Sequence, residues 1–146
     1  MTLLQQARAF REAFGQETLD NISRYGFVKK KLWDLQLRLI DEEAKELLDA
    51  ADEVFADPEN PGKREEVLKE LSDVVFVCYQ FAAAFNIDLD GAMERIYQSN
   101  MSKLDDDGKP IFRSDGKVLK GPNYIPPDLS DLVPEPTSNL YDTHGK

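Results

Sequence analysis

Residues 27–55 read FVKKKLWDLQLRLIDEEAKELLDAADEVF, and this stretch decides the fold. It has no proline or glycine, and its apolar residues recur every three or four positions, which is typical of an amphipathic helix. The breaker cluster DPENPG follows at residues 57–62, and the helical pattern resumes from Lys63 to about Phe85. Two long helices joined by so short a connection are expected to pack as an antiparallel hairpin.

A shorter helix is expected on each side of this hairpin. Residues 2–14 have apolar side chains at helical spacing, with Thr2 as a candidate N-cap and Gly15 as a stop signal. Asp88 is a candidate N-cap for a further helix that would run from Leu89 to about Lys103. The sequence therefore predicts four helices.

The remaining residues, 105–146, have a different character. Asp115 and Gly116 separate two short apolar segments, which favours a β-hairpin. From Gly121 onward the chain holds five of its eight prolines and has no helical period, so an extended tail is expected. The predicted fold class is all-α: a four-helix core in residues 1–104, completed within the same domain by a short hairpin and tail.

Composition excludes several classes of protein. The chain has 146 residues, 41% of them apolar, which suits one compact domain. Its formal charge of −10 argues against binding a nucleic-acid polymer. We expect a cytoplasmic protein, because the sequence has neither a secretory signal nor an apolar stretch of about 20 residues. With His144 as the single histidine and Cys78 as the single cysteine, catalysis would depend on carboxylates, amides and cations.

Two acidic pairs interrupt the apolar faces of the long helices. Glu43 and Glu46 form the first pair, and Glu70 and Asp73 form the second. Residues three positions apart share a helix face. At about 100° per residue, Glu43 lies only about 40° from Leu39, in the middle of the apolar stripe. Both pairs are therefore expected to face the neighbouring helix.

One such pair arises easily by chance on a glutamate-rich helix, where it would belong to an ordinary solvated face. Two pairs on packed helices favour a cation site, because an unpartnered buried carboxylate costs several kcal/mol. Few local cations can neutralise them, since Lys63 is two turns away on its helix. Mg²⁺ suits carboxylates, waters and substrate phosphates. The predicted cofactor is Mg²⁺, for which Mn²⁺ can substitute.

The last predicted helix adds Asn100 and Lys103 on its apolar side, at about 20° and about 320° from Leu89. They could simply belong to a fraying helix end, where a lysine interacts with the helix dipole. Beside four carboxylates, however, a lysine that binds phosphate and an asparagine that orients the ligand are the better interpretation. More cations follow at Lys109, Arg113, Lys117 and Lys120.

These motifs resemble a known signature. Glu42-Glu43-Ala44-Lys45-Glu46 followed by Glu70-Leu71-Ser72-Asp73 is similar to the EExxE…ExxD pattern of the all-α nucleoside triphosphate pyrophosphohydrolases. That superfamily includes the MazG-like group, dimeric dUTPases and phosphoribosyl-ATP pyrophosphohydrolases. The segments Gln98–Lys103 and Gly116–Tyr124 also look like segments of MazG-like proteins. The resemblance covers about residues 30–125.

The resemblance implies a function and a set of site residues. The metal ligands would be Glu43, Glu46, Glu70 and Asp73, with Glu42 as a second-shell residue or base. The expected catalytic residues are Glu42, Glu43 and Lys103. A nucleoside triphosphate would be cleaved between its α and β phosphates, giving the monophosphate and pyrophosphate. The expected substrate-binding residues are Asn100, Lys103, Trp33, Arg113, Lys117, Lys120 and Tyr124.

The resemblance also suggests a substrate and an assembly. Purine-directed relatives that act on dGTP favour a purine (d)NTP, with Trp33, Phe14 or Tyr124 as candidates for stacking on the base. Relatives are homodimers or homotetramers, which fits a third helix with eleven apolar residues among the twelve at 74–85. The alternatives are a dUTPase, a phosphoribosyl-ATP pyrophosphohydrolase, or a non-catalytic helical module for oligomerisation or nucleotide binding.

Overall fold

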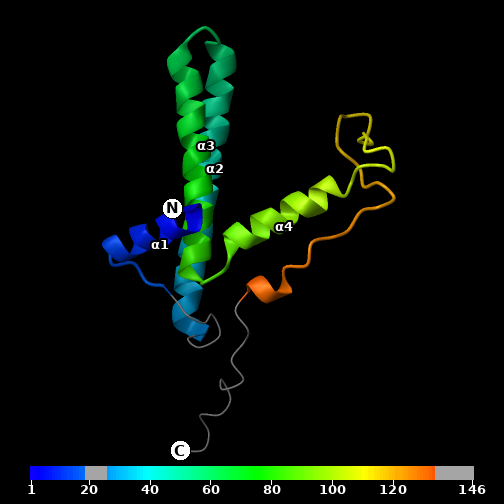
Figure 1. Ribbon diagram of the computed structural model, residues 1–146. Helices are drawn as coiled ribbons and strands as arrows, with labels where there is room; N and C mark the ends of the chain where they lie inside the picture. Colours follow the sequence, from blue (N-terminus) through cyan, green and yellow to red (C-terminus); the bar gives the residue numbers. More distant parts are fainter. Residues whose placement is uncertain (19–25, 134–146) are drawn as a thin grey trace, which may run out of the picture. The chain divides into compact units, whose positions relative to one another are not determined.

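The computed structural model describes residues 1–18 and 26–133, and side chains are described outside residues 26–29. Figure 1 shows that the described chain is helical. The helices are α1 (Leu3–Ala13), α2 (Gly26–Ala56), α3 (Pro61–Ala84) and α4 (Leu89–Met101), followed by the short 3₁₀ helix η2 (Ser130–Leu132). The all-α prediction is confirmed. None of these helices is long and apolar enough to cross a membrane.

The described chain forms two compact units, residues 1–87 and residues 88–133. The first unit contains α1, α2 and α3, and the second contains α4 and η2. Helix α4, which was predicted to belong to the four-helix core, therefore groups with the residues that follow it, up to Val133.

Local signals explain where the helices begin. The Thr2 hydroxyl accepts a hydrogen bond from Gln5 N at 3.2 Å, and the Gln5 side chain accepts one from Thr2 N at 2.8 Å. This capping box confirms the predicted start of α1. The start of α3 was predicted two residues too late, because Pro61 lies at its first turn and Asn60 caps it. Proline suits that position, where its missing N–H would have no helical partner.

Helices α2 and α3 pack along each other as an antiparallel pair (Figure 1). Near the connection between them, Lys63 Nζ lies 2.8 Å from a carboxylate oxygen of Glu53. At the other end, the Trp33 ring meets the rings of Phe81 and Phe85 edge-on at centroid distances of 4.8 and 5.1 Å. This register brings the middle of α2 level with the middle of α3, where both acidic pairs lie.

Helix α1 packs against α3 and is fixed there by polar as well as apolar contacts. The Phe10 ring meets Phe76 edge-on at 5.2 Å. The Arg11 guanidinium, only 1% exposed, donates to the Gln80 side-chain carbonyl at 3.4 Å and to the Glu17 backbone carbonyl at 2.6 Å. The buried guanidinium thus links α1, the segment after it, and α3.

In the second unit, α4 begins as predicted, since the Asp88 side chain accepts a hydrogen bond from Gly91 N at 2.9 Å. The helix ends at Met101, so Lys103 lies in the turn beyond it. The helical-wheel position predicted for Lys103 is therefore wrong. The described residues 105–120 hold a single antiparallel bridge, Phe112 with Val118, where a β-hairpin was predicted. Each side is too short to form a strand.

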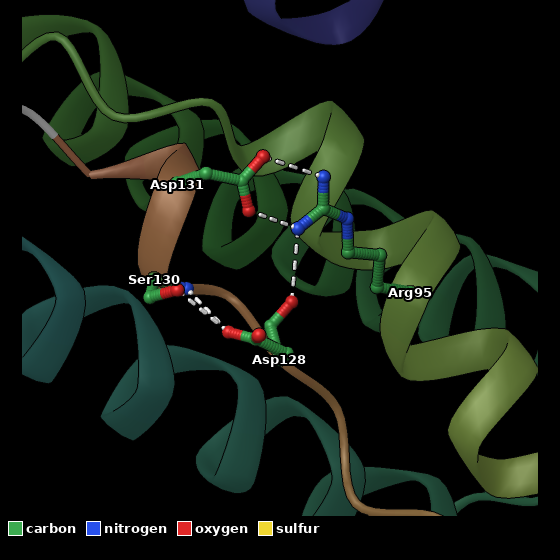
Figure 2. Close-up of polar contacts among 4 residues, drawn as sticks. All are labelled: Arg95, Asp128, Ser130 and Asp131. Atoms are coloured by element: carbon green, nitrogen blue, oxygen red, sulfur yellow. Dashed lines mark hydrogen bonds and ion pairs between the residues drawn. The ribbon is translucent and has the colours of Figure 1, made fainter.

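The chain then returns along α4, as Figure 2 shows. The Arg95 guanidinium pairs with both carboxylate oxygens of Asp131 and donates to the Asp128 backbone carbonyl at 2.9 Å. The Ser99 hydroxyl donates to the Ile125 carbonyl at 2.7 Å. These contacts fix residues 125–131 against α4. The last part of the predicted tail, residues 134–146 with His144, lies outside the described residues.

Candidate metal centre

Three of the four predicted metal ligands come together between α2 and α3. Glu43, Glu46 and Glu70 each place one carboxylate oxygen within 4.8 Å of the others. Glu70 is only 5% exposed, Glu43 is half-buried and Glu46 is exposed. The cluster therefore has a buried side, formed mainly by Glu70, and a side open to solvent at Glu46.

The crowding of the carboxylates increases the proton affinity of Glu43. Burial raises the pKa of the Glu43 carboxyl above its ordinary value of 4.5, and the negative charges of Glu46, Asp73 and Glu70 raise it further. Both effects disfavour the ionised form. The negative charge of Glu43 is thus poorly compensated.

Glu70 has the opposite behaviour because Lys69 is beside it. Lys69 Nζ lies 2.9 Å from a Glu70 oxygen and 3.2 Å from an Asp73 oxygen. The hydrogen bond from Lys69 is the largest cause of the lowered pKa of Glu70, and it also raises the pKa of the lysine above its ordinary value. The expectation that few local cations could reach these acids is wrong for this pair. The flexible lysine side chain lies along the helix to reach Asp73 four residues later.

The donors fit a hard divalent cation. One oxygen each of Glu43 and Glu70 is buried and has no hydrogen-bond partner in the described part of the chain. An ionised carboxylate oxygen left in this state is costly. Clustered carboxylate oxygens are also the donors that Mg²⁺ and Mn²⁺ prefer. Glu43, Glu46 and Glu70 are therefore suited to hold such an ion, while the role of Asp73 as a fourth ligand stays a prediction.

The other predicted residues of the first unit lie outside this cluster. Glu42 is exposed on α2 beside Glu43. Trp33 packs with Phe81 and Phe85 at the far end of the helix pair, leaving 37% of its surface exposed. The Phe14 ring stacks on Phe10 at 4.4 Å. Both rings have structural contacts and retain exposed surface, so their roles in base stacking stay predictions.

The predicted phosphate-binding residues all belong to the second unit. Asn100 is exposed and Lys103 is half-buried. The Arg113 guanidinium pairs with the Asp115 carboxylate, and the Lys120 ammonium lies 4.8 Å from the centroid of the Tyr124 ring. The structure thus brings Lys120 and Tyr124 together, while the approach of Asn100, Lys103 and Lys117 to the carboxylates stays a prediction.

Sequence reasoning missed two residues near the cluster. The first is Lys69, whose position directly before Glu70 was a signal that could have been used. The second is Gln36, which is 3% exposed and has a buried side-chain oxygen without a hydrogen-bond partner among the side chains that the structure describes. Gln36 is seven residues before Glu43, so it lies on the same face of α2, about two turns away.

Paired helices that bring carboxylates together, with buried oxygens that have no partner in the described chain, fit the fold and site of the all-α pyrophosphohydrolases. The phosphoribosyl-ATP pyrophosphohydrolase family model matches residues 7–100, and the chain belongs to that family. A search of curated proteins gives no match.

A solved structure similar to this chain is that of a "putative NTP pyrophosphohydrolase" from Exiguobacterium sp. 255-15. The two share 21% sequence identity over 87% of this chain and 89% of the other, with a TM-score of 0.41.

Proposed function

We propose that the protein is a Mg²⁺-dependent pyrophosphohydrolase that converts a (d)NTP to the (d)NMP and pyrophosphate. The observation that supports this most is the cluster of Glu43, Glu46 and Glu70, whose oxygens lie within 4.8 Å of one another. Buried oxygens of Glu43 and Glu70 that have no hydrogen-bond partner among the described residues favour a cation there. A triphosphate chain is a substrate that a cation held in this way can bind.

The four carboxylates Glu43, Glu46, Glu70 and Asp73 would hold the ion, and Mn²⁺ could replace Mg²⁺. When bound, the ion supplies positive charge that offsets the charge of the phosphates and lowers the pKa of a water molecule. Helices α2 and α3 fix the carboxylates before substrate arrives, so little reorganisation is needed. The buried side of Glu70 keeps bulk water from that part of the site.

In the proposed reaction, one water oxygen bonds to the α-phosphorus and the bond from that phosphorus to the bridging oxygen breaks. Pyrophosphate leaves, and the proton of the water passes to a carboxylate. Glu42 is the proposed acceptor because it is exposed directly beside Glu43. Asn100 and Lys103 are proposed to bind the phosphate chain, with Arg113, Lys117 and Lys120 as further cations.

For the base we propose a purine, with dGTP as the first candidate and Trp33 or Tyr124 as the stacking residue. Phosphoribosyl-ATP is the second candidate substrate, and the family match over residues 7–100 favours it. Both molecules present a triphosphate chain, so the same carboxylates would serve either one. Two alternatives remain: a dUTPase, and a helical module that binds nucleotide or oligomerises without catalysing a reaction.

We also propose that the protein works as a homodimer or homotetramer in the cytoplasm. Support comes from apolar side chains left exposed on α3, namely Leu68, Leu71, Val75 and Phe76. Three of them line a groove shared with Leu3 of α1. An apolar surface of this kind is typical of protein interfaces, and a second copy would cover it.

The test is a substrate panel. Purified protein is incubated with Mg²⁺ and the eight common nucleoside triphosphates, dUTP or phosphoribosyl-ATP, and both pyrophosphate and orthophosphate are measured. Pyrophosphate and the monophosphate are expected, in equal amounts. Orthophosphate alone would contradict the proposed bond cleavage, and the preferred substrate separates the candidates.

The panel needs two variants. Glu70→Ala should lose orders of magnitude in rate while keeping the oligomeric state of the parent, whereas Glu65→Ala, at an exposed position of the same helix, should keep its activity. A parent protein with no turnover of any substrate would favour the non-catalytic module.

A further inference from the structure

Lys69 contacts two of the carboxylates that a metal ion would need. Its ammonium nitrogen lies 2.9 Å from one oxygen of Glu70 and 3.2 Å from one oxygen of Asp73. These are two of the four proposed ligands and they form the whole contribution of α3. A cation built into the chain is therefore in contact with the carboxylates that would bind the cation from solution.

The position of Lys69 distinguishes it from the other lysines of the helix pair. Lys45 pairs with Asp41 at 2.8 Å and Lys63 pairs with Glu53 at 2.8 Å, and neither partner is a proposed ligand. Lys69 alone among these three contacts the cluster. Among the described ion pairs, only those of Lys69 connect Asp73 to Glu70.

The side chain of Lys69 is also free to leave. It is 60% exposed, whereas the Glu70 side chain is 6% exposed. Rotation of the lysine into solvent would break a part-buried contact with Glu70 and a more accessible contact with Asp73, without opening the buried part of the helix pair. The pair with the accessible Asp73 side chain is weak. A divalent ion would replace the positive charge that the buried Glu70 loses, so the ion can displace the ammonium.

We propose that Lys69 is a built-in competitor of the metal ion: its ammonium neutralises Glu70 and Asp73 in the metal-free protein and is displaced when the ion binds. This inference rests on the proposed metal site. Lys69 would then stabilise the metal-free fold and, through the same contacts, reduce the affinity of the site for the metal ion.

The test uses Lys69→Met, which keeps most of the length of the side chain and removes its charge. Mn²⁺ binding is measured by isothermal titration calorimetry without substrate, and melting temperature is measured with and without Mn²⁺. Relative to the parent, Lys69→Met should bind Mn²⁺ roughly three- to tenfold more tightly, because the ion no longer has to displace an ammonium from Glu70 and Asp73. Its metal-free melting temperature should fall, because the acids lose their counter-charge.

Two further variants make the test specific. Lys45→Met removes a lysine that is paired elsewhere on α2, next in sequence to Glu46, and controls for the general field of a positive charge near the site. It should change Mn²⁺ affinity by less than twofold. Lys69→Arg keeps the charge and should keep the parent's affinity, and it provides a folded comparison if Lys69→Met is too unstable without metal.

The possible failures can be told apart. If the parent does not bind Mn²⁺, the proposed metal site and the role of Lys69 are both wrong. If the parent binds Mn²⁺ but Lys69→Met binds no more tightly, the metal site stands and only the role of Lys69 is overturned. The same conclusion follows if Lys45→Met and Lys69→Met have equal effects.

Discussion

Glu43 of α2 and Glu70 of α3 bring carboxylate oxygens within 4.8 Å of each other, although they come from different helices. Each also has a buried oxygen without a hydrogen-bond partner in the described chain. Their charges are compensated unequally, since Glu70 contacts Lys69 and the pKa of Glu43 is raised by burial and by its acidic neighbours. The metal-free protein therefore carries an electrostatic cost that is centred on Glu43.

The first prediction concerns Glu43 and pH. Because its pKa is raised in the folded state, ionisation of Glu43 reduces stability as pH rises from the ordinary value of 4.5 towards the raised value. Glu43→Gln removes that cost. At pH 8 without metal, its melting temperature should exceed that of the parent by a few degrees, and the two should converge below pH 4.5, where both side chains are neutral.

Differential scanning calorimetry across this pH range measures the effect, with the exposed neighbour Glu42→Gln as the control. A metal-free Glu43→Gln protein that melts below the parent at pH 8 would contradict the account. With Mn²⁺ present the order should reverse, because the variant lacks one proposed ligand.

The second prediction concerns the buried Arg11. Replacing it with methionine would leave the Gln80 side-chain carbonyl and the Glu17 backbone carbonyl without the donors they now have. Hydrogen bonds from a charged donor stabilise a fold by about 1.5–3 kcal/mol, so Arg11→Met should lower the free energy of unfolding by roughly 2 kcal/mol.

Urea unfolding measures this loss. Arg8→Met, at an exposed position of α1, is the matched control and should change stability little. Equal stability of Arg11→Met and the parent would show that the contacts of Arg11 do not fix α1 to α3.

The third prediction concerns Gly121 in the second unit. A Cβ atom at this position would lie 2.5 Å from the Lys103 carbonyl oxygen and 2.9 Å from that of Leu104. Both are backbone atoms, so Gly121→Ala must displace the chain and break the 2.9 Å hydrogen bond from Gly121 N to the Lys103 carbonyl. If Lys103 binds phosphate as proposed, KM should rise severalfold while the helices remain folded.

Amide hydrogen exchange at residue 121 and steady-state kinetics check this outcome. Gly62→Ala serves as the control, since its Cβ would meet only the Asn60 side-chain oxygen, at 3.2 Å. Unchanged exchange in Gly121→Ala would show that the close approach is not required.

The fourth prediction concerns the apolar groove of α3. Leu71 is 47% exposed there, and a glutamate in its place would put a charge inside the proposed interface between copies. Burying an unpaired charge is costly, so Leu71→Glu should convert the oligomer to a monomer of 16.6 kDa.

Light scattering after size-exclusion chromatography distinguishes these masses. Phe55→Glu, at a position that is 87% exposed near the connection between α2 and α3, should leave the mass of the parent unchanged. A parent that is itself monomeric would contradict the proposed assembly.

The sequence by itself determined the helices and the candidate ligands. Helical periodicity is a local property, and it places Glu43 and Glu70 within apolar stripes before any packing is known. The caps Thr2 and Asp88 are equally local, because each bonds a backbone N–H only a few residues ahead. These features follow from residues within one or two turns of one another.

Only the tertiary structure decided how these parts are connected. The Arg11 contact with Gln80 joins residues that are 69 positions apart, and the burial of Gln36 depends on what packs over its face of α2. The contacts of Lys69 with Glu70 and Asp73 depend on rotamers that a helical wheel does not contain. Periodicity fixes the direction in which a side chain leaves its helix, but its partners depend on side-chain reach and on packing between distant segments.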